Sequence, residues 1–527
     1  MSLRSVIESC SAANSFDKMD GGTIMSVLSQ LQPQSVFHYF EEICRIPHGS
    51  GNIRQISDYL KQFADSRGLE CIQDEFLNII IIKEATAGYE EEEAIILQGH
   101  MDMVAIKKPD CAVDMTKEPL QLYIEDNKIR ANGTSLGGDD GIAVAYALAL
   151  LDAQDISHPR LEIVLTVDEE TGMEGAKEID LSMLRGKRLI NLDQEEEGVI
   201  ITSCAGGARV DVSVPMCTEQ VDRKSVQAVR IQVSGLMGGH SGMEIHKGRG
   251  NANCLLGRIL KGSSERFGIR LITMYGGQAD NAIPREAAAL TLVDITQTNE
   301  LISYVKETEN SLRQELGDRD AGFTVVCEVS DEQTVSDGCS TGHECHGNSI
   351  KCLDKASTDR ALDCLCKLPN GVIAMSPDLE GLVQTSLNLG VIAHKEDALC
   401  YSYAVRSSVD GDRERLCEQM TEVAARSGAK AQVRNAYPGW AYRKDSPLRE
   451  TVTQIYEQMY GKKPVLQAIH AGLECGILAS KIEGLDCVSI GPDMADVHTA
   501  EESLDIASVR RTWEYLLHIL AYRLDSV

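Results

Sequence analysis

Three short apolar runs, each closely followed by acidic or histidine side chains, constrain the fold of this chain more than any other feature. Residues 94–97 lead to His100 and Asp102, residues 161–167 to Asp168-Glu169-Glu170, and residues 188–192 to Asp193. Such runs are typical of buried strands, and residues two apart, such as His100 and Asp102, project to the same side of an extended chain. Because open α/β sheets place ligands at the carboxyl ends of strands, the pattern indicates a metal site at a sheet edge.

The size and charge of the chain exclude several classes of protein. The formal net charge of -29 opposes binding to nucleic acids and to anionic membranes, because both would repel it. No apolar stretch approaches the roughly 20 residues that cross a bilayer, and the start of the chain lacks the pattern of a secretory signal. The 17 cysteines, scattered without a framework, suggest reduced thiols. We therefore expect a cytoplasmic protein with neither a nucleic-acid nor a membrane partner.

The order of the predicted elements indicates one domain inserted into another. With 527 residues, the chain exceeds what one hydrophobic core usually sustains. After an N-terminal extension (residues 1–30), strands alternate with helices over 31–206, which predicts a mostly parallel sheet. Residues 207–437 carry strands and helices with few acidic clusters, in two similar α+β halves. The alternation of predicted strands and helices resumes over 438–527, so we expect an α/β domain interrupted by an α+β domain.

The acidic pair Asp139-Asp140 follows Gly137-Gly138 and precedes a predicted helix at 141–151. A carboxylate at this place can bridge two cations. It can equally serve as the N-cap of the helix, a position that aspartate favours. The sequence around these residues leaves both roles open.

Two metal ions can be supplied with ligands from these clusters. A two-metal hydrolase needs cations roughly 3.5–4 Å apart, a bridging carboxylate and an open position for water. One ion would take His100, Asp139 and Asp193. The other would take Asp139, Glu170 and His498, although a single histidine such as His498 is more often structural.

The assignment of ligands to two metal ions leaves two nearby acidic residues that would bind no metal. Glu169 lies beside a ligand and would bind no metal, so it is the natural general base for the attacking water. Asp102 would hold the ring of His100 by accepting a hydrogen bond from it. Histidine and carboxylate ligands suit zinc first, with manganese or cobalt as alternatives.

Six motifs resemble those of the aminoacyl-histidine dipeptidases, also called Xaa-His dipeptidases or peptidase D, in the M20 metallopeptidase superfamily. The motifs are GHMDMV at 99–104, GTSLGGDDG at 133–141, DEETGMEGA at 168–176, GGHSGMEIH at 238–246, NAIPREA at 281–287 and IHAGLECG at 469–476. The resemblance extends from about residue 35 to the C-terminus. It implies a catalytic α/β domain with a mostly parallel sheet, interrupted by an inserted α+β lid domain.

The resemblance also implies a function and further site residues. The expected activity is hydrolysis of unblocked dipeptides, typically with C-terminal histidine and including β-alanyl-histidine. His240 would stabilise the tetrahedral oxyanion from the lid, and Asn281 and Arg406 would hold the ends of the substrate, with Arg406 suited to a carboxylate. His470 and Glu474 either line the pocket or order the turn between a strand and a helix.

The sequence leaves several alternatives open for the function, for one cysteine-rich segment and for the assembly. An N-acyl-amino-acid deacylase would share the same metal centre, and a non-catalytic metal-binding protein could keep the fold, although it would not need Glu169. The segment 339–352, with Cys339, His343, Cys345, His346 and Cys352, could form a zinc knuckle but matches no strong template. The expected partner is a small dipeptide substrate. The oligomeric state is open, with a homodimer as one option.

Overall fold

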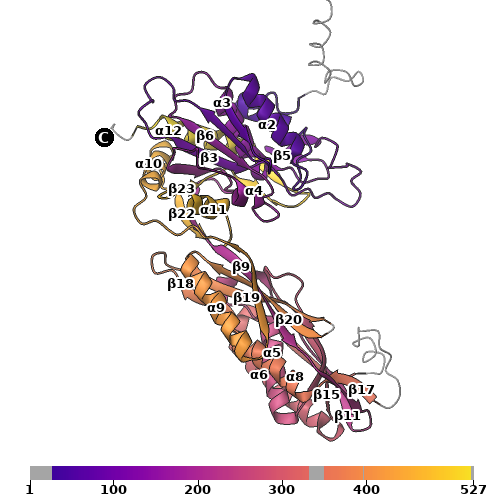
Figure 1. The fold of residues 1–527 in the computed structure, drawn as a ribbon. Helices are drawn as coiled ribbons and strands as arrows, with labels where there is room; N and C mark the ends of the chain where they lie inside the picture. The colour runs from indigo at the N-terminus through magenta and orange to yellow at the C-terminus, as the bar shows by residue number, and fades with distance from the viewer. Residues whose placement is uncertain (1–25, 331–348, 396, 524–527) are drawn as a thin grey trace, which may run out of the picture.

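Two large sheets organise the molecule (Figure 1). The computed structural model describes residues 26–330, 349–395 and 397–523. The first sheet has eight strands in the order β1-β2-β6-β3-β7-β23-β8-β22. Its strands are β1 (Glu70–Gln73), β2 (Ile79–Lys83), β3 (Ile95–His100), β6 (Leu161–Thr166), β7 (Arg188–Asn191), β8 (Val199–Cys204), β22 (Val465–Ile469) and β23 (Asp486–Ser489).

The centre of this sheet is parallel, as the sequence predicts. Strands β6, β3, β7 and β23 run parallel to one another, and so do β8 and β22. Strands β1 and β2 join the edge in antiparallel fashion, and β23 meets β8 through one antiparallel pair. The parallel arrangement brings the carboxyl ends of β3, β6 and β7 to one edge.

Helices cover both faces of the eight-stranded sheet, which explains why β3, β6 and β8 are buried along their whole length. Ile95 and Leu97 of β3 pack into the core shared with α1, α3 and α12, whereas Ile96 packs on the opposite face with α11. The helices of this region are α1 (Gln34–Ile43), α2 (Arg54–Ser66), α3 (Gly138–Asp152), α4 (Glu174–Glu178), α10 (Pro447–Tyr460), α11 (Glu474–Lys481) and α12 (Ile506–Ala521).

Helix α3 lies directly against β3. Its residues from Gly138 to Leu151 are buried, in agreement with the predicted apolar helix. Gly99 of β3 allows the close approach, because a Cβ there would lie 2.5 Å from Asp140 Oδ2 and 2.6 Å from Ala143 Cβ. A small sheet beside α3 is formed by β4 (Leu122–Glu125), β5 (Lys128–Ala131), β24 (Met494–Ala495) and β25 (Ser503–Asp505).

The second large sheet is formed by residues 206–437, here called the insert. Its order is β16-β11-β15-β13-β19-β20-β9-β21, with β18 beside β19, and its pairings are antiparallel. The strands are β9 (Gly206–Pro215), β11 (Val226–Ser234), β13 (Arg270–Gly276), β15 (Ala287–Asp294), β16 (Thr324–Val329), β18 (Gly371–Met375), β19 (Val383–Lys395), β20 (Ala398–Ser407) and β21 (Lys430–Tyr437). Two strand pairs flank it, β10 (Thr218–Asp222) with β17 (Ser349–Leu353) and β12 (Gly239–His240) with β14 (Ala282–Ile283).

Helices gather on one face of the insert's sheet, as Figure 1 shows, which is the α+β arrangement expected from the sequence. They are α5 (Ala252–Phe267), α6 (Thr298–Leu316), α8 (Lys355–Lys367) and α9 (Asp410–Arg426). The two connections between the sheets are hydrogen-bonded to each other, because Cys204 and Trp440 exchange N–H···O bonds of 3.0 Å. We retain as a proposal the division into domains at 31–206, 207–437 and 438–527.

Candidate metal centre

His100 is the last residue of β3 and points into a cluster of carboxylates. Its side chain is buried, and its Nε2 lies 3.1 Å from Asp139 Oδ1 and 3.6 Å from Asp193 Oδ1. The other ring nitrogen, Nδ1, lies 3.0 Å from the carbonyl oxygen of Asp102 and 3.4 Å from its Oδ1. A proton on Nδ1 can therefore be donated to Asp102, which leaves the Nε2 lone pair facing the carboxylates. This is the usual arrangement of a metal-binding histidine.

Asp139 connects His100 to a second histidine that lies far away in the sequence. Its Oδ1 faces His100, and its Oδ2 lies 3.1 Å from His498 Nε2. The same nitrogen of His498 lies 2.7 Å from Glu170 Oε1. One carboxylate thus lies between two imidazoles, which is the position a bridging ligand would need.

The described residues contain three groups of side chains whose nitrogen and oxygen atoms all lie within 4.8 Å of one another: His100, Asp139 and Asp193; Asp139, Glu170 and His498; and His100, Glu169 and Glu170. The first two groups are those counted from the sequence as ligand sets. The third places the Glu169 carboxylate within reach of the same centre. The structure thus brings the predicted ligands together, and their assignment as ligands stays a prediction.

The carboxylates of this cluster repel one another in a buried setting. Burial and the charge of Asp139 raise the pKa of Asp193 well above its usual value. Burial, with the charges of Asp193, Glu170 and Asp139, raises the pKa of Glu169 to about 8, although His100 opposes this. Divalent cations would relieve such repulsion. Imidazole and carboxylate donors fit zinc, manganese or cobalt, so these side chains could hold metal ions.

Asp102 holds three neighbours rather than facing the centre. Besides its contacts with His100, its Oδ1 accepts a hydrogen bond of 3.1 Å from the backbone N–H of Glu169. Its Oδ2 accepts a hydrogen bond of 2.8 Å from the Ser50 hydroxyl. These contacts fix both the ring of His100 and the start of the acidic turn. Ser50 carries no sequence signal, because it belongs to an ordinary turn after α1.

The alternative role of Asp139 or Asp140 as an N-cap is wrong. Neither side chain caps α3, and both residues have non-helical backbone angles. The Asp140 carboxylate instead accepts a 3.2 Å hydrogen bond from the backbone N–H of His100. The backbone N–H groups of residues 136–139, at the start of the helix, donate instead to Glu502, which the sequence alone does not single out. In the sequence, Glu502 is simply one glutamate of an acidic turn after His498.

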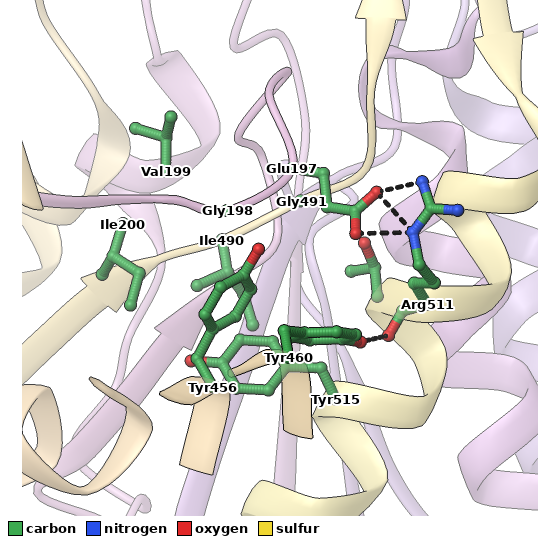
Figure 2. Close-up of a pocket in the computed structure, with 11 residues that line it drawn as sticks. Glu197, Gly198, Val199, Ile200, Tyr456, Tyr460, Ile490, Gly491, Arg511 and Tyr515 are labelled. Atoms are coloured by element: carbon green, nitrogen blue, oxygen red, sulfur yellow. Dashed lines mark hydrogen bonds and ion pairs between the residues drawn. The ribbon is translucent and has the colours of Figure 1, made fainter. Parts of the chain in front are cut away.

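The loop after β7, which carries Asp193, is anchored to α12 (Figure 2). The guanidinium of Arg511 donates to both carboxylate oxygens of Glu197, over 2.6–3.0 Å. The backbone N–H of Glu197 donates to Asp493 Oδ1 at 2.7 Å, and the N–H of Asp493 donates to Ser508 Oγ at 2.8 Å. The segment that follows Asp193 and the segment that precedes His498 are thereby tied to the same helix.

His240 and Arg406 meet on the insert side of the connection. A Cβ on Gly242 would lie 3.1 Å from His240 Cε1, 3.1 Å from Arg406 Nε and 2.3 Å from the carbonyl oxygen of His470. The Nδ1 of His240 accepts hydrogen bonds from the backbone N–H groups of Gly242 (3.3 Å) and Met243 (3.0 Å). Burial and the charge of Arg406 lower the pKa of His240. The neutral ring therefore carries its proton on Nε2, where it can be donated.

His470 and Glu474 differ in their surroundings. His470 Nε2 lies 2.7 Å from the Ser386 hydroxyl of β19, which links the α/β part to the insert. Glu474 is fully buried, and its Oε2 accepts hydrogen bonds from Gln98 Nε2 (2.5 Å) and Thr166 Oγ1 (2.6 Å). For Glu474, these contacts favour the expected role of ordering the turn between a strand and a helix, which stays a prediction.

The remaining candidate residues are Asn281 and those of the cysteine-rich segment 339–352. Asn281 is exposed, and its carbonyl oxygen accepts a 2.8 Å hydrogen bond from the N–H of Ser241, next to His240. Cys339, His343, Cys345 and His346 lie outside the described residues, whereas Cys352 is buried in β17. Within the described parts of the chain, no helix is both long and apolar enough to cross a membrane.

Comparisons with known proteins point to peptidases. The model of peptidase family M20/M25/M40 matches residues 96–522. The chain is 37% identical to the cytosol non-specific dipeptidase of Escherichia coli (strain K12), over 94% of this chain and 99% of that protein. The crystal structure of aminoacylhistidine dipeptidase from Vibrio alginolyticus is 34% identical, with a TM-score of 0.86 over 94% of this chain and 98% of its own.

A more distant likeness concerns the fold alone. The aminopeptidase PepT from Bacillus cereus is 17% identical, with a TM-score of 0.56, and the match covers 93% of this chain and 98% of that one. The combination of the two sheets therefore occurs also in a chain of quite different sequence.

The neighbours Glu169 and Glu170 can be separated by their metal content. If Glu170 is a ligand and Glu169 is not, Glu170→Gln should lower the number of bound metal ions, while Glu169→Gln should leave it near that of the wild type. The reason is that an amide oxygen is a much weaker ligand than a carboxylate. Elemental analysis of both variants after zinc loading and desalting measures this. The reverse pattern would exchange the two roles.

Proposed function

The chain belongs to peptidase family M20/M25/M40, and from this membership and its acidic centre we propose a metal-dependent dipeptidase. Its substrates would be unblocked dipeptides, including those with C-terminal histidine and β-alanyl-histidine. The observation that carries the proposal is that Asp139 belongs to two ligand groups, one with His100 and one with His498. The relatives named a cytosol non-specific dipeptidase and an aminoacylhistidine dipeptidase support the substrate class.

The centre would hold two divalent ions, zinc in the first place and manganese or cobalt as alternatives. His100, Asp139 and Asp193 would bind one ion, and Asp139, Glu170 and His498 the other. Bound ions of this kind polarise a carbonyl and lower the pKa of water. Glu169 would accept the proton of the attacking water and then donate it to the leaving amine.

The insert would act as a lid that supplies the remaining groups. The Nε2–H of His240 would donate to the oxyanion that forms during attack. Arg406, buried beside it, would pair with the substrate carboxylate through its planar fork. Asn281, in the loop that pairs with the His240 segment, would contact the substrate end. The hydrogen bond between His470 and Ser386 supports a lid that contacts the α/β part in this region.

We further propose a cytoplasmic location. The scattered cysteines support it, and so does the word cytosol in the name of the Escherichia coli relative. The acidic net charge makes nucleic-acid partners unfavourable. A homodimer remains one option for the assembly.

His240 can be tested as the oxyanion donor. His240→Ala should lower kcat by about 10²–10³, as the loss of one such donor usually does, because its Nε2–H would no longer meet the developing charge. Metal content should not change. Steady-state kinetics of the zinc-loaded protein measure this, with His246→Ala, an exposed histidine of the same segment, as the matched control. Near-normal activity of His240→Ala would leave His240 with only its role in the turn.

The ends of the substrate distinguish a dipeptidase from an N-acyl-amino-acid deacylase. Arg406→Ala should weaken transition-state binding of a dipeptide by about 2–5 kcal/mol, because a desolvated charge loses its partner. A C-terminally amidated dipeptide should be affected much less, since it brings no carboxylate. The comparison is made in kcat/KM, with Arg406→Lys to retain the charge and with Arg434→Ala, an exposed arginine of the insert, as the control.

The same assay tests the activity itself. The zinc-loaded wild type should hydrolyse β-alanyl-histidine and other dipeptides and leave N-acetyl-histidine largely intact. Rapid hydrolysis of N-acetyl-histidine would instead favour the deacylase. No turnover of any of these substrates by metal-loaded protein would support a non-catalytic metal-binding protein.

A further inference from the structure

We propose that Glu502 is a positioning residue that fastens the segment carrying Asp139 to the segment carrying His498, and thereby sets the affinity of the centre for one metal ion. The inference rests on the proposed two-metal function. Glu502 does not belong to any of the candidate ligand groups found among the described residues. Its role would be exerted through the residues it holds.

The Glu502 side chain occupies a nest of backbone N–H groups. Its Oε2 accepts hydrogen bonds from the N–H of Leu136 at 2.8 Å and of Gly137 at 3.1 Å. Its Oε1 accepts from the N–H of Gly138 at 2.8 Å and, more weakly, of Asp139 at 3.4 Å. Consecutive N–H groups that converge in this way form an anion-binding concavity. Here the anion is a carboxylate of the chain itself.

Both carboxylate oxygens are therefore engaged, and the residue is buried with 3% of its surface exposed. A carboxylate in this state has no oxygen left for a metal ion. Its contribution to the centre is to hold residues 136–139 in one conformation. That conformation directs the Asp139 side chain toward His100 and His498 instead of toward the N-terminus of α3.

The segment that carries His498 and Glu502 is itself held by strand pairing. Glu502 directly precedes β25, whose Leu504 pairs with Ile129 of β5. Four residues before Glu502 stands His498, in a turn where its φ is +62°. The side chain of Glu502 thus spans the short distance between two segments that each provide a ligand of the same candidate ion. The two segments are 363 positions apart in the sequence, so no local contact could align them.

Gly138 makes the close approach of the two segments possible. A Cβ at this position would lie 3.3 Å from Glu502 Oε1 and 3.3 Å from Met494 Sδ. Such a contact is tight, so a methyl group would push against the carboxylate from inside the nest. A substitution at Gly138 can therefore disturb the same contact without changing the charge of Glu502.

The test compares metal affinities of Glu502→Gln and Glu501→Gln. In Glu502→Gln the amide would direct N–H donors at backbone N–H donors, whereas Glu501 is exposed, pairs with Lys108 and keeps its place in the same segment. Zinc binding is measured by titration in competition with a chromogenic chelator, together with the midpoint of thermal unfolding. We expect Glu502→Gln to bind the ion held by Asp139, Glu170 and His498 about 10–100-fold more weakly, as loss of a supporting partner does. The other ion, which shares only Asp139 with the two fastened segments, should be weakened less.

A second measurement, of kcat and KM at saturating zinc, distinguishes a positioning role of Glu502 from a merely structural one. Saturating zinc should restore kcat of Glu502→Gln to near that of the wild type, with KM for the dipeptide unchanged, and Glu501→Gln should behave as the wild type throughout. If Glu502→Gln does not fold, Gly138→Ala takes its place and should show the same selective loss of one ion.

The proposal is overturned if the folded variants bind both ions as tightly as the wild type, or if both ions are weakened equally. It is equally overturned if neither variant folds, because Glu502 then serves stability alone. A wild type that binds no zinc would instead contradict the proposed two-metal function, so the two failures are distinguishable.

Discussion

Carboxylates that repel one another gather at one edge of the eight-stranded sheet, and the surrounding segments hold them there. Asp139 and Asp193 form one close group with His100, and Glu169 and Glu170 form another with the same histidine. Such a cluster is unfavourable in a buried place unless positive charge compensates it. Divalent cations would supply that charge, with His100 and His498 as neutral ligands.

A second set of contacts keeps these side chains in place. Asp102 holds the ring of His100 and the backbone of Glu169, and the pair Glu197–Arg511 ties the loop after Asp193 to α12. Glu502 supplies the carboxylate that accepts hydrogen bonds from the N–H groups at the start of α3. Because the capping contact comes from a distant segment, Asp139 and Asp140 are released from it. The carboxylates of the centre are thus divided into those that face the candidate ions and those that support the backbone.

The sequence predicts much of the fold and of the centre. Residues 94–97, 161–167 and 188–192 are rich in apolar side chains, so their strands and the positions of His100 and Asp193 follow from these short apolar runs and from the rule for parallel sheets. The helix over 141–151 was recognisable for the same reason. The lid residues His240 and Arg406 came from motif resemblance, since an isolated histidine or arginine has no periodic signal.

Other features could not be predicted because they depend on contacts between distant segments. Glu502 differs in no local way from Glu501, yet one is buried among backbone N–H groups and the other is exposed. The choice for Asp139 between capping and the metal centre was open for the same reason. The burial of Glu474, with Gln98 and Thr166, likewise depends on two strands and a helix, β3, β6 and α11, meeting at one place.

In the proposed two-metal centre, one carboxylate, that of Asp139, would join both ions. The most direct measurement is a crystal structure of the zinc-loaded protein with anomalous difference maps at the zinc absorption edge. We expect two peaks roughly 3.5–4 Å apart, one beside His100 and Asp193 and the other beside Glu170 and His498, with Asp139 between them. A single peak, or peaks that Asp139 does not reach, would contradict it.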